Sequence, residues 1–129
     1  MYPNLKAILA YLMLLPLFSM VRYCEPHINP KMVRHGNISH FNPEKNHKVG
    51  LIISSKVYEE LPSVIIIKKE KIKVGSARYN ELMTLATNNY KKILKAVARE
   101  KNLVLIVENG GVRDYPTIYV TNDCISKIE

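Results

Sequence analysis

Residues 76–107 read SARYNELMTLATNNYKKILKAVAREKNLVLIV, and this stretch decides the fold. In its first part, apolar side chains recur at steps of three and four residues, which is the spacing of one helix face. These side chains are Tyr79, Leu82, Met83, Ala86, Tyr90, Ile93, Leu94 and Val97. Ser76 is well placed as the N-cap, and the apolar run Leu103–Val107 predicts a buried strand. We therefore expect a long amphipathic helix packed on a sheet.

The segment before this helix predicts a second strand and a short helix. Val49–Ser54 is an apolar, β-branched run that is typical of a buried strand. Ser54 or Ser55 can cap a helix that continues to Leu61, and Pro62 interrupts it.

The stretch Val64–Val74 stays open between two interpretations. The run Val64–Ile67 and the alternation that follows it favour a strand. A helix that presents Ile65, Lys69 and Ile72 on one face is the alternative.

The chain after the second strand predicts a turn and a last helix. Asn109, Gly110 and Gly111 form the turn, and Val112–Val120 is an extended stretch through Pro116. Thr121 is expected to cap the final helix, with Asp123 in its first turn and with Ile125 and Ile128 facing inward. The order of elements predicts an α/β or α+β fold, a small sandwich with a long amphipathic helix on a short sheet.

An N-terminal membrane helix is expected before this domain. Residues 5–21 read LKAILAYLMLLPLFSMV, which is nearly all apolar and spans roughly 25 Å as a helix. The residues expected to anchor it are Leu5, Ala7, Ile8, Leu9, Leu12, Leu14, Leu15, Leu17, Phe18 and Val21. A cleaved signal peptide is the competing interpretation, but no small-x-small cleavage site follows the run. The predicted organisation is an anchor at 1–23, a linker at 24–47 and a domain at 48–129.

Charge alone favours a cytoplasmic domain. Arg22, Lys31 and Arg34 follow the apolar run, whereas only Lys6 and the amino terminus precede it. The family resemblance described below favours the periplasm instead, and we give that resemblance more weight.

The linker is expected to be an irregular tether. It contains three prolines and all four histidines, but it has neither helical nor strand periodicity. The histidines lack metal-ligand spacing and are interpreted as solvated, so no metal site is expected. They are His27, His35, His40 and His47. Cys24 and Cys124 are interpreted as ordinary small residues that are able to pair only in an oxidising compartment.

No catalytic or cofactor signature stands out in the sequence. The 129 residues carry a formal net charge of +8, which fits nucleic acid, anionic lipid or plain solubility equally well. The histidines are absent from the expected domain, and the acidic residues are scattered over positions that look exposed. Those acidic residues are Glu59, Glu60, Glu70, Glu81, Glu100, Glu108, Asp114 and Asp123. We expect no enzyme activity and no cofactor.

A lysine-rich run follows the apolar residues of the ambiguous stretch. It contains Lys68, Lys69, Lys71 and Lys73. Because it has no aromatic side chains for base stacking, we interpret it as a solvated strand edge and expect no nucleic acid as partner.

The residues from Ala77 onward resemble the C-terminal half of the TrbI family of F-type conjugative transfer proteins. The matching positions are Ala77, Arg78, Tyr79 and Asn80, then Leu103–Val107, then Val120 and Thr121. Val49–Leu61 also looks like the family's first strand and helix, whereas Val64–Val74 departs from the family's more polar stretch. The resemblance implies a single-pass inner-membrane protein with a periplasmic domain. It also implies a non-enzymatic accessory role in pilus extension and retraction, with other secretion subunits as partners.

The strand–helix–strand ending is also similar to the body of the Skp/OmpH periplasmic chaperones. Those chaperones cage unfolded outer-membrane proteins between long helical arms. The residues between Leu61 and Ser76 are too few for such arms, so a chaperone of this kind without long arms is the second hypothesis.

Overall fold

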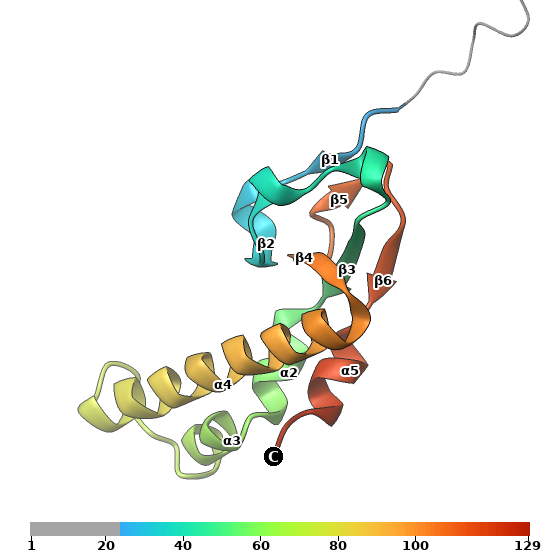
Figure 1. The fold of residues 1–129 in the computed structure, drawn as a ribbon. Coiled ribbons are helices and arrows are strands. Elements are labelled where there is room, and N and C mark those ends of the chain that lie inside the picture. The colour runs from blue at the N-terminus through green and yellow to red at the C-terminus, as the bar shows by residue number, and fades with distance from the viewer. Residues whose placement is uncertain (1–23) are drawn as a thin grey trace, which may run out of the picture.

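The structure, a computed structural model, describes residues 24–129 (Figure 1). The expected membrane helix and its anchor residues at 1–23 lie outside this range. Within residues 24–129, no helix is both long enough and apolar enough to cross a membrane.

A four-stranded mixed sheet forms the centre of the fold, in the order β2-β4-β3-β6. The strands are β2 (Val33–His35), β3 (Lys48–Ile52), β4 (Leu103–Glu108) and β6 (Thr117–Tyr119). β3 pairs in parallel with both β4 and β6, whereas β2 is antiparallel to β4. Parallel neighbours need a long crossover connection, and the helical segment between β3 and β4 provides it.

Helices pack on one face of this sheet (Figure 1). They are α2 (Ser54–Glu60), α3 (Pro62–Lys69), α4 (Ala77–Lys101) and α5 (Thr121–Ser126), and one of them, α3, lies farther out against α2 and α4. Their apolar side chains form the main core with the sheet residues Ile52, Leu103 and Ile106. The helix residues of that core are Val57, Ala86, Tyr90, Ile93, Leu94, Val97, Ala98 and Cys124, and Leu61 and Val120 join them.

The N-terminal segment covers the opposite face of the sheet. Strand β1 (His27–Ile28) pairs with β5 (Val112–Arg113), and β2 joins the main sheet. Three short 3-10 helices connect these parts: η2 (Pro30–Met32), η3 (Ile38–His40) and η4 (Pro43–Lys45). Ile28, Val49, Leu105 and Val107 are buried in this second core, with Met32, Val33, Phe41, Val104, Val112 and Tyr115 packed against them.

This second core corrects the expectation of an irregular tether at 24–47. Strand β4 is apolar on both faces, so each face needs a cover to remove it from water. The helices cover one face, and the segment from Ile28 to Phe41 covers the other. The absence of periodicity in this segment reflects irregular packing rather than a solvated linker.

The fold class predicted from the sequence is confirmed in its coarser form, a mixed α/β fold with one long helix on small sheets. The Ser76 hydroxyl accepts a hydrogen bond from the Tyr79 N–H (3.2 Å) and caps α4 as predicted. The predicted buried strand is β4. The turn at 109–111 is closed by a bond from the Gly111 N–H to the Glu108 carbonyl (2.9 Å).

The ambiguous stretch 64–74 is helical in its first part. Pro62 occupies the first turn of α3, where its missing N–H costs nothing, and the helix packs against α4. This packing outweighs the β propensity of the isoleucines. Lys68 and Lys69 therefore lie in the last turn of a helix, and their interpretation as a strand edge is wrong.

Candidate functional site

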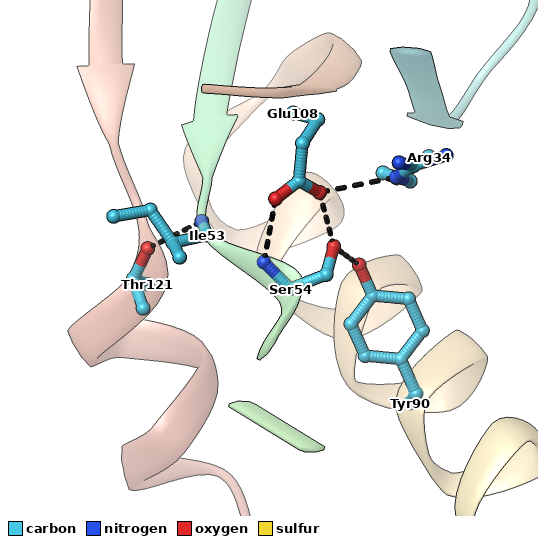
Figure 2. Close-up of polar contacts among 6 residues, drawn as sticks. All are labelled: Arg34, Ile53, Ser54, Tyr90, Glu108 and Thr121. Atoms are coloured by element: carbon cyan, nitrogen blue, oxygen red, sulfur yellow. Dashed lines mark hydrogen bonds and ion pairs between the residues drawn. The ribbon is translucent and has the colours of Figure 1, made fainter. Parts of the chain in front are cut away.

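The polar residues that converge most closely lie where the parallel strands end. Ser54 follows β3, Glu108 is the last residue of β4, and Thr121 follows β6. In open α/β sheets, ligands bind at the carboxyl ends of the strands, so this edge is the first place to look for a functional site. Figure 2 shows these residues together with Arg34 from β2 and Tyr90 from α4.

The Glu108 carboxylate is the centre of the cluster. Its Oε1 accepts the Ser54 backbone N–H (3.0 Å), and its Oε2 accepts both the Ser54 hydroxyl and the Nε–H of Arg34 (3.1 Å). The Ser54 hydroxyl also contacts the Tyr90 hydroxyl. One carboxylate therefore connects β4 to β2 and α2, and Ser54 extends the connection to α4.

Glu108 also serves as the N-cap acceptor that α2 lacks locally. The N-cap position is Ile53, which has no side-chain acceptor, and Ser54 is the first helical residue. Neither serine therefore fills the capping role expected for Ser54 or Ser55. A carboxylate placed against the first N–H of a helix also interacts favourably with the helix dipole. A residue from a distant strand thus replaces a local cap.

Burial acts on the Glu108 carboxylate in the opposite direction to its hydrogen bonds. Burial alone raises the pKa of Glu108, but the hydrogen bonds from the Ser54 hydroxyl and backbone, together with Arg34, outweigh it and lower the pKa below its ordinary value. The Glu108 side chain is only 19% exposed, so it keeps its charge inside the fold through these donors.

The phenol of Tyr90 is held in its neutral form. Burial raises the pKa of Tyr90 to about 12, although the hydrogen bond with Ser54 lowers it in part. The ring also packs against Tyr58, with the ring centroids 4.7 Å apart. The Tyr90 ring therefore packs as an apolar core group, and its hydroxyl forms a hydrogen bond. This phenol does not lose its proton near neutral pH.

Thr121 has a different role from the predicted cap. The N-cap of α5 is Val120, and the buried Thr121 hydroxyl accepts the Ile53 N–H (3.0 Å). This bond links the end of β3 to the start of α5. Asp123 does lie in the first turn of α5, and Ile125 and Ile128 pack against the main core, as predicted.

We call the cluster of Arg34, Ser54, Tyr90 and Glu108 the connector, because its chemistry is suited to joining elements of the fold. Both oxygens of Glu108 are occupied by donors from the protein, and the Ser54 hydroxyl is placed between a carboxylate and a neutral phenol. A nucleophilic serine instead needs a base that is free to take its proton. The geometry fits a device that fixes four elements in place.

No family model, curated protein or solved structure matches the chain. The assignment of a function therefore depends on the geometry of the molecule and on the resemblance described above.

His35 and His47 are placed differently from the solvated tether that the sequence predicted, whereas His27 and His40 agree with solvation. The Nδ1 of His47 accepts the Asn42 N–H (3.0 Å), and the His47 carbonyl accepts the Tyr115 hydroxyl. His35 lies in β2, where burial and the nearby Lys95 lower its pKa. His27 and His40 are exposed. Across residues 24–129, histidine, cysteine and acidic side chains do not gather into a group of three that could hold a metal.

The two cysteines lie in contrasting environments. Cys24 is exposed at the start of the described range, and Cys124 is buried in α5. Burial, reinforced by the neighbouring Asp123 carboxylate, raises the pKa of the Cys124 thiol to about 11. Cys124 is therefore a core residue of low reactivity.

The positions that carry the family resemblance are not brought together. Ala77, Arg78, Tyr79 and Asn80 form the first turn of α4, at the end that lies away from the sheet (Figure 1). Arg78 pairs there with Glu70 (2.6 Å). Thr121 lies at the sheet edge instead.

Sequence reasoning does not predict the connector, because it places Glu108 among the acidic residues that look exposed. A usable signal was present, since an acidic residue directly after a buried apolar strand lies at the sheet edge where polar side chains meet. Its partners Ser54 and Arg34 are 54 and 74 residues away, and no local pattern points to them.

Proposed function

We propose that this protein is a non-enzymatic, membrane-anchored accessory subunit of an F-type conjugative type IV secretion system, and that it acts on pilus extension and retraction. The observation that carries the proposal is a helical hairpin with apolar side chains on its outer surface. We call this hairpin the arm and define it as residues 62–85, which comprise α3, the loop after it and the first part of α4. Figure 1 shows the arm extending away from the strands.

Large apolar side chains on both helices of the arm are exposed to solvent. Ile65 is 46% exposed, Ile66 36% and Leu85 56%. Large apolar side chains that stay exposed on a folded protein are candidates for contact with a partner. The polar residues at the sheet edge, by contrast, are engaged with one another, so the arm is the better candidate for binding a partner.

The resemblance to the TrbI family supplies the biological setting of the proposal. It includes the helix start at Ala77–Asn80, the strand Leu103–Val107 and the approach to the last helix at Thr121. We propose that residues 1–23 anchor the chain in the inner membrane and that the domain lies in the periplasm. Such anchoring raises the effective concentration of the arm near other membrane subunits without requiring strong contacts.

Gene deletion in a host that carries a conjugative element tests this role. We expect pilus number, pilus length or transfer frequency to change, and the wild-type gene to restore it. Unchanged values for all three would refute the proposal. An activity reporter fused after Glu129 tests the periplasmic location separately.

Complementation with an arm variant tests which surface is used. Ile65→Ser combined with Leu85→Ser should fail to restore transfer. The matched control is Ile38→Ser combined with Ile118→Ser, because both of these isoleucines are 38% exposed but lie outside the arm. Circular dichroism and equal cellular abundance would show that both variants fold. Full complementation by the arm variant would remove the arm from the proposal.

The same exposed side chains favour a second candidate, a chaperone that is similar to Skp/OmpH but has a short arm. To test it, the full chain is placed in nanodiscs and mixed with a urea-unfolded β-barrel protein on dilution, and light scattering is followed. Empty nanodiscs are the control. Suppressed scattering supports this candidate, and scattering equal to the control at stoichiometric excess dismisses it.

A further inference from the structure

The tip of the arm presents one apolar side chain on a tight turn. The turn runs from Lys73 to Ser76 and is closed by a hydrogen bond from the Ser76 N–H to the Lys73 carbonyl (3.1 Å). Val74 occupies its second position and is 75% exposed, which makes it the most exposed of the large apolar side chains of residues 24–129. Gly75 follows with a φ of +85°, as the third position of a type II turn requires.

Hydrogen bonds join this turn to the start of α4. The Ser76 hydroxyl donates to the Lys73 carbonyl (2.7 Å) and at the same time accepts the Tyr79 N–H as the cap of α4. Val74 is therefore displayed at a defined place on the end of a helix. A rigid display costs little additional conformational entropy when a partner binds.

Four lysines lie close before Val74 in the chain, at the C-terminal end of α3 and in the loop that follows it. They are Lys68, Lys69, Lys71 and Lys73. The one acidic residue among them, Glu70, is paired with Arg78. The four ion pairs found in residues 24–129 use Arg34, Arg78, Lys101 and Lys127, so the tip lysines are left for an external anion.

We propose that the tip of the arm docks on a membrane surface that contains anionic lipids, with its lysines among the phosphate headgroups and Val74 entering the interface. An exposed apolar side chain next to a run of lysines is a combination that such surfaces bind. Nucleic acid is disfavoured because the lysine run contains no aromatic side chain for base stacking. The inference concerns lipid and does not depend on the proposed role in conjugation.

A fluorescent probe at the tip tests this contact directly. The full-length variant with Val74→Cys and Cys24→Ser is labelled with an environment-sensitive fluorophore, and the buried Cys124 is left unlabelled. The protein is added to vesicles of phosphatidylcholine alone or mixed with phosphatidylglycerol. Any binding through residues 1–23 occurs with both, so only the local signal at residue 74 reports on the tip. We expect a blue shift with anionic vesicles that disappears at high salt.

Charge variants then show which lysines matter. Each lysine close to an anionic surface strengthens partitioning by about fivefold, so K68E/K69E/K71E/K73E should abolish the shift. K71E/K73E changes only the loop, leaves α3 intact and should weaken the anionic-specific shift by at least about twentyfold in lipid concentration. The matched control is K91E/K92E/K95E, which removes lysines from the middle of α4 and should keep the shift.

Several results would overturn the proposal. These are a shift of equal size with neutral vesicles, no shift with either vesicle, or loss of the shift in the α4 control instead of the tip variants. An equal shift on adding soluble polyglutamate without vesicles would assign the tip to an acidic protein.

Discussion

At the level of single residues, Glu108 takes the place of a local cap for α2 and joins several elements of the fold. This carboxylate receives the first N–H of α2, the hydroxyl of Ser54 and the guanidinium of Arg34. Charge-assisted hydrogen bonds of this kind are stronger than neutral ones, and removing one partner leaves the other groups unsatisfied. A local change here should therefore be felt across several elements.

We expect Glu108→Gln to lower the free energy of unfolding by about 1–3 kcal/mol, since the amide keeps one acceptor but loses the charge. Urea unfolding of the full chain, followed by circular dichroism, measures the change. Glu59→Gln is the control because Glu59 is exposed in the same region, and it should change stability by less than about 0.5 kcal/mol. Equal effects of the two substitutions would show that the connector contributes nothing.

The same carboxylate predicts the pH dependence of stability. The pKa of Glu108 is lower in the folded protein than its ordinary value of 4.5. Its contribution is therefore present above that ordinary pKa and is lost as pH falls through the lower folded value. Unfolding curves from pH 7 to pH 3 should show the difference between wild type and Glu108→Gln shrinking toward the acidic end. A difference that stays constant or grows as pH falls would contradict the sign.

At the level of elements, two glycines with similar backbone angles differ in what surrounds them. Gly36, after β2, and Gly75, in the tip turn, have φ values of +89° and +85°. A Cβ on Gly36 would lie 2.2 Å from the carbonyl oxygen of Val104, whereas nothing lies within 4 Å of a Cβ on Gly75. The close approach at Gly36 shows that the N-terminal segment is packed tightly against β4.

Alanine substitutions at these two glycines separate backbone strain from steric clash. Gly75→Ala should cost about 1–2 kcal/mol, which is the price of a left-handed conformation alone. Gly36→Ala adds a clash with backbone and should cost about 3 kcal/mol or more. Thermal or urea unfolding of both variants gives the comparison. If Gly36→Ala were the milder of the two, residues 33–36 would not be a fixed part of the domain.

The sequence predicted those elements that local spacing determines. The helix 77–101 follows from apolar residues at helical steps and a serine cap, and β4 follows from an uninterrupted apolar run. The segment 28–41 could not be predicted in this way, because Met32, Val33 and Phe41 are placed by contacts with a distant strand. The continuous apolar run of β4 was a partial signal, because a strand that is apolar on both faces must be packed against other parts of the chain on both sides.

The connector at the sheet edge was less predictable than the fold. Its members come from β2, α2, α4 and β4, and only the folded topology brings them together. Sequence reasoning also misplaced Thr121, because a threonine before a short helix has the pattern of a cap. The same hydroxyl instead satisfies the N–H of Ile53 at the end of β3.

At the level of the whole molecule, two cores lie on opposite faces of one sheet and share its strands, so the stability of each core depends on the other. The helix side contains Cys124, which is fully buried, whereas Cys24 is exposed outside both cores. Cys124 therefore reports on the opening of the main core, and Cys24 provides an internal comparison.

Alkylation at pH 8 should modify Cys24 at least about a hundredfold faster than Cys124, because the Cys124 thiol is buried and its pKa is raised to about 11. Mass spectrometry of peptides after timed labelling measures both rates. In urea above the unfolding midpoint, the two rates should become similar. Rapid labelling of Cys124 in the native protein would contradict the buried position of α5.

The pairing of β3 has a consequence for synthesis on the ribosome. Both neighbours of this strand, β4 and β6, are encoded more than 50 residues after it, beginning at Leu103 and Thr117. At translation rates of about 5–20 residues per second, several seconds pass between the synthesis of Val49–Ile52 and the synthesis of their first parallel neighbour. Until then, this apolar segment of the nascent chain is exposed and prone to aggregate. Protection of the segment during that interval therefore affects the yield of native protein.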